Sequence, residues 1–221
     1  NHPEAISSLK VGDTILLENA KMRLVVESVE DDGVTCKIVA GGILGNRKSM
    51  SVPGVHLNIP YVSDADRADL DYACTHGGEF LAISFVNCKE DVLAIKEILK
   101  EHDRLDLKII CKIESELGIK NLESILEVSD GAMVARGDLG IETGVENLPL
   151  YQQMMIDKCR AKGKRVIMAT QMMSSMKNNI RPTNAEVTDV ANAVLAGCDA
   201  VMTSDETTMG KYPVETIQNM A

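Results

Sequence analysis

The sequence predicts an α/β protein in which a short antiparallel β segment precedes a run of parallel strands and helices. Up to about residue 60, short runs of Val, Ile, Leu and Thr alternate with Gly and Asp turn signals, which is typical of antiparallel strands. After residue 60, apolar runs alternate with amphipathic stretches, which indicates strands connected by helices. Polar residues follow the apolar runs, at the end of the strands where parallel barrels place their sites. We therefore expect two domains, residues 1–60 and residues 61–221.

The composition is that of a soluble globular protein and excludes several functions. Of the 221 residues, 45% are hydrophobic and 25% are charged. A net charge of −10 and an aromatic content of 3% argue against a nucleic-acid partner, because nucleic acids select basic and stacking surfaces. No apolar run approaches the ~20 residues of a membrane helix, and no signal peptide is visible, so we expect no membrane association.

The cysteines and histidines indicate neither a disulfide framework nor a zinc site. The six cysteines form no C-x-x-C pair and lie on apolar segments, so we predict reduced thiols and a reducing compartment, the cytoplasm. The four histidines lie away from the predicted strand ends, which makes a His-ligated zinc centre improbable.

The first 60 residues predict a small antiparallel barrel or sandwich. Turn signals at Gly12-Asp13, Asp32-Gly33 and Gly41-Gly42 separate its short strands. Lys48 lies in the last loop of this segment, just before a Pro53-Gly54 turn.

Beyond residue 60 the alternation of patterns fixes the expected elements. Ser63 is a predicted N-cap, and Gly163 a predicted helix stop. The expected strands span residues 80–85, 109–114, 131–136, 165–172 and 200–207. The expected helices span residues 64–76, 89–102, 118–128 and 150–162, a segment from Pro182 to about residue 197, and a segment starting at Pro213.

Two neighbouring apolar runs end in charged residues of complementary chemistry. Because side chains alternate along a strand, Lys112 and Glu114 are expected to share one face, and so are Arg136 and Asp138. Two carboxylates from adjacent strand ends beside a lysine form an oxygen-rich site suited to a hard cation such as Mg²⁺. The lysine would then lie where a phosphoryl group binds. Together with these residues, the predicted strand ends carry Ser84, Thr170 and Glu206.

Six motifs in order resemble the pyruvate kinase family: KIE, MVARGDLG, ATQM, RPT.AE, DVANAV and S.ET..G.YP. The resemblance implies a partial (β/α)8 TIM barrel, comprising strands four to eight, preceded by part of a small antiparallel β-barrel lid. An eight-stranded barrel needs about 250 residues by itself. We therefore expect this chain to be the central portion of a longer enzyme.

The resemblance also implies roles for individual residues. Glu114 and Asp138 would hold Mg²⁺ or Mn²⁺, and Lys112 would neutralise the transferred phosphoryl group. Thr170 would lie near the methylene carbon of enolpyruvate, where a proton is delivered through a water relay. Lys48 would bind the nucleotide phosphates. The backbone of Ala135, Arg136 and Gly137 would bind the substrate carboxylate. The side chain of Arg136 could equally form a structural ion pair. Ser204 and Glu206 would support the site from behind.

As a pyruvate kinase, the protein would convert phosphoenolpyruvate and ADP to pyruvate and ATP in glycolysis. The resemblance implies K⁺ as a second cofactor, whose site lies outside this chain, and a homo-oligomer, a tetramer in the family. Because the family's first barrel strands supply further substrate ligands, we expect the isolated 221-residue chain to be inactive.

Departures from the family pattern keep two alternatives open. Asp205 replaces a Gly beside Glu206 and adds a negative charge near a site for anionic phosphates, and Asn184 replaces an Arg. The residues after Lys48, Ser49 to Ser51, replace the family's G-V-N. One alternative is a Mg²⁺-dependent barrel lyase or aldolase acting on 2-oxo acids. The other is a non-catalytic paralogue that binds metabolites or partners.

Overall fold

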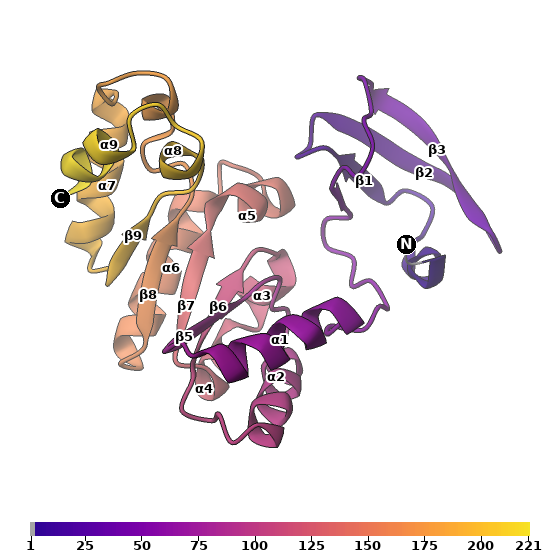
Figure 1. Ribbon diagram of the computed structural model, residues 1–221. Coiled ribbons are helices and arrows are strands. Elements are labelled where there is room, and N and C mark those ends of the chain that lie inside the picture. The colour runs from indigo at the N-terminus through magenta and orange to yellow at the C-terminus, as the bar shows by residue number, and fades with distance from the viewer. Residues whose placement is uncertain (1–2) are drawn as a thin grey trace.

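The computed structural model describes residues 3–221, which form two sheets of different type (Figure 1). An antiparallel sheet has the strand order β3-β2-β1-β4, and a parallel sheet has the order β5-β6-β7-β8-β9. The described ends of the chain lie on opposite sides of the molecule, one beside each sheet (Figure 1). The antiparallel sheet ends at Ser51 and the first α-helix begins at Asp64, while the predicted domain boundary at residue 60 stays a prediction.

The antiparallel sheet is small and open. A two-residue turn at Asp31–Asp32 joins its two longest strands, next to the turn signal predicted at Asp32-Gly33. The structure refines the expected barrel to a single four-stranded sheet with β3 and β4 at its edges. Its core holds four buried residues, Leu9, Ile15, Val26 and Val52. Its elements are η1 (Pro3–Ser8), β1 (Thr14–Leu17), β2 (Met22–Glu30), β3 (Gly33–Ala40) and β4 (Met50–Ser51).

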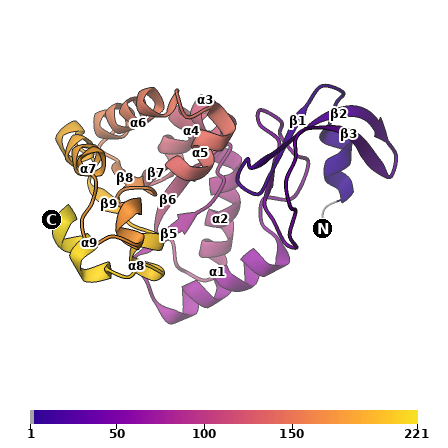
Figure 2. The same cartoon turned by 90° about the horizontal axis from the view of Figure 1, so that it is seen from above.

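The parallel sheet follows the order of the chain, as a succession of βα units requires. Seen from above, helices lie along the outside of the row of strands, which is the arrangement of part of an α/β barrel (Figure 2). The apolar run at residues 80–85 predicts a buried strand, and this prediction is wrong for β5, because β5 forms the edge of the sheet and Phe80 is half exposed. The strands are β5 (Phe80–Ile83), β6 (Lys108–Ile113), β7 (Gly131–Ala135), β8 (Arg165–Ala169) and β9 (Ala200–Met202).

The helices begin and end close to the predicted signals. Ser63 caps α1 through a reciprocal capping box with Asp66, and Gly163, with φ +64°, follows the end of α6. The predicted helix over residues 118–128 is two helices that break at Asn121. The helices are α1 (Asp64–His76), α2 (Lys89–Glu101), α3 (Glu116–Lys120), α4 (Leu122–Val128), α5 (Arg136–Thr143), α6 (Leu148–Ala161), η2 (Ser174–Lys177), α7 (Asn184–Ala196), α8 (Asp205–Thr208) and α9 (Pro213–Met220).

The last three strands are shorter than predicted, which changes how their polar residues are placed. β7 ends at Ala135 and α5 begins at Arg136, so the prediction that Arg136 and Asp138 share a strand face is wrong. Both residues lie in the first turn of a helix. β8 ends before Thr170, and β9 ends before the short helix α8 that holds Glu206.

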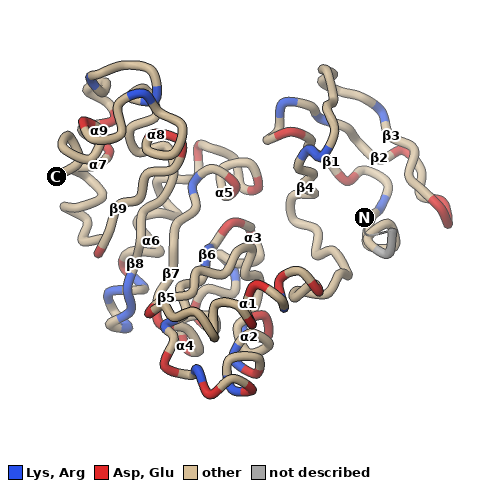
Figure 3. Tube along the Cα trace, in the orientation of Figure 1, with Lys and Arg blue, Asp and Glu red and all other residues tan. Residues whose placement is uncertain are grey.

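The main core lies between the parallel sheet and its helices. Fully buried side chains from β6, β7, α4 and α6 meet there, among them Ile113, Val134, Leu126 and Met155. A smaller cluster with Ile110, Met133 and Ala169 covers the other side of the sheet. The charged residues lie mainly on helices and connecting segments, with an acidic group at the tip of the β2–β3 hairpin (Figure 3). None of the helices within residues 3–221 combines the length and apolar character needed to span a membrane.

Candidate active site at the carboxyl ends of the parallel strands

Each parallel strand is followed by a polar residue at the same edge of the sheet. These residues lie directly after β5, β6 and β8, or in the helical turns after β7 and β9. This edge is the one at which α/β barrels build their active sites. The five residues are Ser84, Glu114, Asp138, Thr170 and Glu206.

Lys112, Glu114 and Ser84 form a connected polar group. The Lys112 ammonium lies 3.0 Å from Glu114 Oε1 and donates to Ser84 Oγ at 2.9 Å. The backbone N–H of Phe85 donates to Glu114 Oε2 at 2.6 Å. The predicted common face of Lys112 and Glu114 is therefore confirmed, and the lysine is held in a fixed position by two partners.

Glu114 is a buried carboxylate with a second carboxylate nearby. Its side chain is 1% exposed, and burial raises the pKa of this carboxyl above its ordinary value. The Phe85 N–H and Lys112 oppose that rise in pKa, whereas the negative charge of Asp138 adds to it. The two carboxylates are therefore close enough for the charge of Asp138 to act on Glu114.

The two carboxylates fit a hard divalent cation. The described residues contain no group of three or more His, Cys, Asp or Glu arranged for a metal. Mg²⁺ nevertheless needs only one or two carboxylates when substrate oxygens and water complete its shell. A cation between Glu114 and Asp138 would also relieve the repulsion that raises the pKa of Glu114.

Arg136 points into the protein and joins three elements. Its side chain is buried; Nε and Nη2 donate to the carbonyl oxygen of Thr170 at 3.1 and 2.6 Å. Nη1 lies 2.6 Å from Asp189 Oδ2 on α7. Of the two interpretations that the sequence left open, the ion-pair interpretation describes this side chain. Sequence reasoning missed Asp189, although it lies within the DVANAV motif as an acidic residue among apolar positions.

Thr170 occupies an unusual backbone conformation next to Gly137. Its φ is +69°, and that of Gln171 is +54°, a region that side-chain-bearing residues adopt rarely and at a cost in free energy. The backbone N–H of Gly137 donates to Thr170 Oγ1 at 3.0 Å. Together with the bonds from Arg136, this contact holds Thr170 against the first turn of α5. That turn begins directly after Ala135 and includes Gly137 and Asp138.

Glu206 links the segments that follow β8 and β9. It is 2% exposed, and its two oxygens accept hydrogen bonds from the backbone N–H groups of Met173, at 3.3 Å, and Ser204, at 2.8 Å. The neighbouring Asp205 is exposed and lies 2.9 Å from Lys177 Nζ. The positive charge of Lys177 thus balances the negative charge of Asp205, which the sequence places near the expected phosphate site.

Lys48 lies on the antiparallel side, where it pairs with Glu18 at 3.3 Å. The structure gives it no contact with the group around Lys112. The two sides meet at a cavity of about 650 Å³, whose lining includes Ser51, Ser84 and Asp138.

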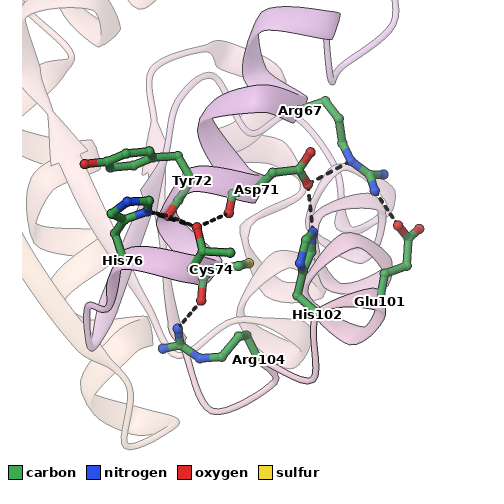
Figure 4. Close-up of polar contacts among 9 residues, drawn as sticks. Arg67, Asp71, Tyr72, Cys74, His76, Glu101, His102 and Arg104 are labelled. Carbon is green, nitrogen blue, oxygen red and sulfur yellow. Dashed lines mark hydrogen bonds and ion pairs between the residues drawn. The ribbon is translucent and has the colours of Figure 1, made fainter.

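Two of the histidines lie in a polar network that joins α1 to α2 (Figure 4). Asp71 accepts from His102 Nε2 at 2.8 Å and from Arg67 Nε at 3.2 Å, and Arg67 also contacts Glu101. The ring of His76 stacks on Tyr72. The contacts of Asp71 and Arg67 hold α1 against the end of α2, whereas the stack of His76 on Tyr72 lies within α1.

Comparisons with known proteins identify the family of this chain. The family model described as the pyruvate kinase barrel domain matches residues 1–217. A pyruvate kinase from Geobacillus stearothermophilus is 47% identical over 99% of this chain and 38% of the relative, and one from Clostridium acetobutylicum is 42% identical over 100% of this chain and 47% of the relative. The crystal structure of a pyruvate kinase from Cryptosporidium parvum superimposes with a TM-score of 0.94 at 40% identity.

The matches cover nearly all of this chain but less than half of each relative. The Cryptosporidium structure is covered to 46%, and this chain to 99%. The shared region includes the parallel strands, the residues at their carboxyl ends and the antiparallel sheet. The chain therefore belongs to the pyruvate kinase family, whose barrel-domain model matches residues 1–217.

Proposed function

We propose that this chain forms the metal- and phosphoryl-binding part of a pyruvate kinase, which transfers the phosphoryl group of phosphoenolpyruvate to ADP and yields pyruvate and ATP. The observation that carries the proposal is the group of Lys112, Glu114 and Asp138 at adjacent strand ends. The chain spans 38% to 47% of the relatives cited above, so the activity of a whole enzyme is proposed and not transferred.

Lys112 would act on the phosphoryl group. Phosphoryl transfer depends mainly on positioning and on neutralising charge at the transferred group. Ser84 and Glu114 hold the ammonium of Lys112 at 2.9 and 3.0 Å, so little reorganisation is needed when the substrate binds. Glu114 and Asp138 would hold Mg²⁺ or Mn²⁺, which supplies further neutralisation of the substrate's negative charge.

The turn between β7 and α5 would hold the carboxylate end of the substrate. Ala135, Gly137 and Asp138 lie where a strand leads into the N-terminus of a helix, and backbone N–H groups at such a place favour an anion. The Thr170 hydroxyl, beside Gly137, would hold a water in the path of the proton that reaches the methylene carbon. Arg136 would keep Thr170 in position through its carbonyl oxygen.

The remaining predicted residues would support this chemistry. Lys48 would bind the nucleotide phosphates, with the antiparallel sheet placed over the site as a lid. Ser204 and Glu206 would fix the loops behind Thr170. We further propose K⁺ as a cofactor, a homotetramer and a cytoplasmic location for the complete enzyme, and we expect the 221-residue chain alone to be inactive. The division into a lid, residues 1–60, and a barrel part, residues 61–221, belongs to the same proposal.

Replacing Lys112 by Met in the intact natural protein tests the proposal. We expect kcat for pyruvate formation to fall by a factor of about 10² to 10³, because one preorganised charge at the transferred group is lost. Lys108→Met is the matched control, since Lys108 lies at the other end of β6 with half of its side chain exposed. An unchanged kcat in Lys112→Met would refute the assigned role, and nucleotide binding would distinguish a kinase from a lyase.

A further inference from the structure

Glu142 forms a polar contact between the two sheets of the molecule. The hydroxyl of Ser51, on β4, donates to Glu142 Oε1 on α5, across 91 positions of sequence. The backbone N–H of Gly54 also donates to the carboxylate of Glu142. One side chain of the barrel region thus accepts from two groups of the antiparallel region.

On the antiparallel side, the contact holds the strand that positions Lys48. Ser51 pairs with Leu16 of β1, and the N–H of Glu18 donates to the carbonyl oxygen of Ser49 at 2.9 Å. Lys48, three residues before Ser51, is paired with Glu18. A shift of β4 would therefore move the Lys48 ammonium with it.

On the barrel side, the contact lies on the helix that carries Asp138. Glu142 follows Asp138 by four residues in α5, so both side chains lie on the same face of that helix. Both line the 650 Å³ cavity, as do Ser51 and Gly54. The contact therefore connects Asp138, the proposed metal ligand, through Glu142 and Ser51 to the segment of Lys48, the residue proposed to bind the nucleotide.

We propose that Glu142 is a positioning residue that fixes the antiparallel sheet, and with it Lys48, at a set distance from Asp138. The inference rests on the proposed function for the roles of Lys48 and Asp138, but the mechanical link between the two sheets does not depend on it. Glu142 itself need not touch a substrate.

The burial of Glu142 favours a specific role. Burial raises the pKa of this carboxyl, and nearby Glu116 and Asp138 add to the rise, whereas Ser51 and Gly54 oppose it. A partly buried carboxylate beside two others costs free energy unless donors compensate it. Its two donors both come from the antiparallel region, so both hydrogen bonds exist only when the two sheets are together.

Amide hydrogen exchange on the 221-residue chain tests the link. In Glu142→Ala, the amides of Gly54 and of β4 should exchange about tenfold faster, because one or two buried hydrogen bonds are lost. Exchange in β6 should stay unchanged, which verifies that the barrel region remains folded. Glu142→Gln keeps an acceptor oxygen and should restore part of the protection. Glu146→Ala, an exposed carboxylate in the segment that follows α5, is the matched control.

Steady-state kinetics of the intact natural protein test the consequence for Lys48. Glu142→Ala should raise KM for ADP about tenfold, by the same loss of contact, while KM for phosphoenolpyruvate changes far less. Ser51→Ala should follow in the same direction and serves as a second variant if Glu142→Ala folds poorly. Equal exchange in Glu142→Ala and Glu146→Ala would overturn the link, and faster exchange with an unchanged KM for ADP would overturn the positioning role. A wild-type protein without kinase activity would refute the proposed function and leave the exchange result standing.

Discussion

The antiparallel and parallel sheets of this protein are held in place by different forces. The parallel sheet is packed between a large apolar core and a second, smaller one, and every residue of its central strand β7 is buried. The antiparallel sheet has a core cluster of only four buried hydrophobic residues and exposes much of β3. One sheet therefore positions its polar residues by packing, whereas the other reaches the site through polar contacts such as that between Ser51 and Glu142.

The two modes of attachment correspond to different needs for rigidity. The ligands of a metal and a phosphoryl group must be fixed within a fraction of an ångström, which a close-packed core provides. A segment that covers a site must be able to move, and a thin core with few buried contacts permits movement. The two lysines with proposed roles show the contrast. The side chain of Lys112, on β6, is 26% exposed, and that of Lys48, in the loop before β4, is 40% exposed.

The same substitution in the two cores should give the largest difference. Ile113→Ala should lower the free energy of unfolding by about 2–5 kcal/mol, because it opens a cavity in a fully buried core. Ile15→Ala, in the core of the antiparallel sheet, should lie at the lower end, about 2 kcal/mol, since its surroundings can collapse around the gap. Urea unfolding followed by circular dichroism measures both values. Equal losses would contradict the contrast in packing.

Replacing one buried acceptor should have a smaller effect than opening a cavity in the main core. Glu206→Gln should cost about 1–3 kcal/mol, because an amide NH₂ would face one of the two backbone N–H groups that the carboxylate accepts. Glu30→Gln is the control in the antiparallel sheet, where the side chain is exposed, and should change stability by less than about 0.5 kcal/mol. The same urea titration measures the free energy of unfolding of both variants. A Glu206→Gln variant as stable as Glu30→Gln would contradict the role of Glu206 as a buried acceptor.

The smallest expected effect is an opposite pH dependence at the two regions. Burial raises the pKa of Glu142 above 4.5, so its contribution to stability is present below that pH and is lost as the pH rises through the folded-state pKa. Hydrogen bonds from Lys21 and then Lys48 lower the pKa of Glu18, so its contribution is present above 4.5 and is lost as the pH falls through the folded-state pKa.

Unfolding free energies measured between about pH 3 and 7 test these signs. Glu142→Gln should flatten the decline of stability at rising pH, and Glu18→Gln should flatten the decline at falling pH. Variants whose curves change with the same sign would show that the two carboxyl groups do not differ in environment as described.

The sequence predicted local features that depend on neighbouring residues. The N-cap at Ser63 follows from the residue type at the start of α1. The apolar face of α2 and the shared face of Lys112 and Glu114 follow from periodicities of 3.6 and 2 residues. The order of the parallel strands follows from the βα alternation. Six family motifs pointed to pyruvate kinase, and the comparisons bear this out.

The turns of the chain and the contacts between residues far apart in sequence depend on the tertiary structure. β7 ends at Ala135 and α5 begins at Arg136, so Arg136 and Asp138 lie in a helix, although alternation along a longer strand would have placed them on one strand face. The contacts of Arg136 with Asp189, of Lys177 with Asp205 and of Ser51 with Glu142 join residues separated by 28 to 91 positions. No local pattern encodes such pairs, because side chains at that separation meet only after the core has brought their elements together.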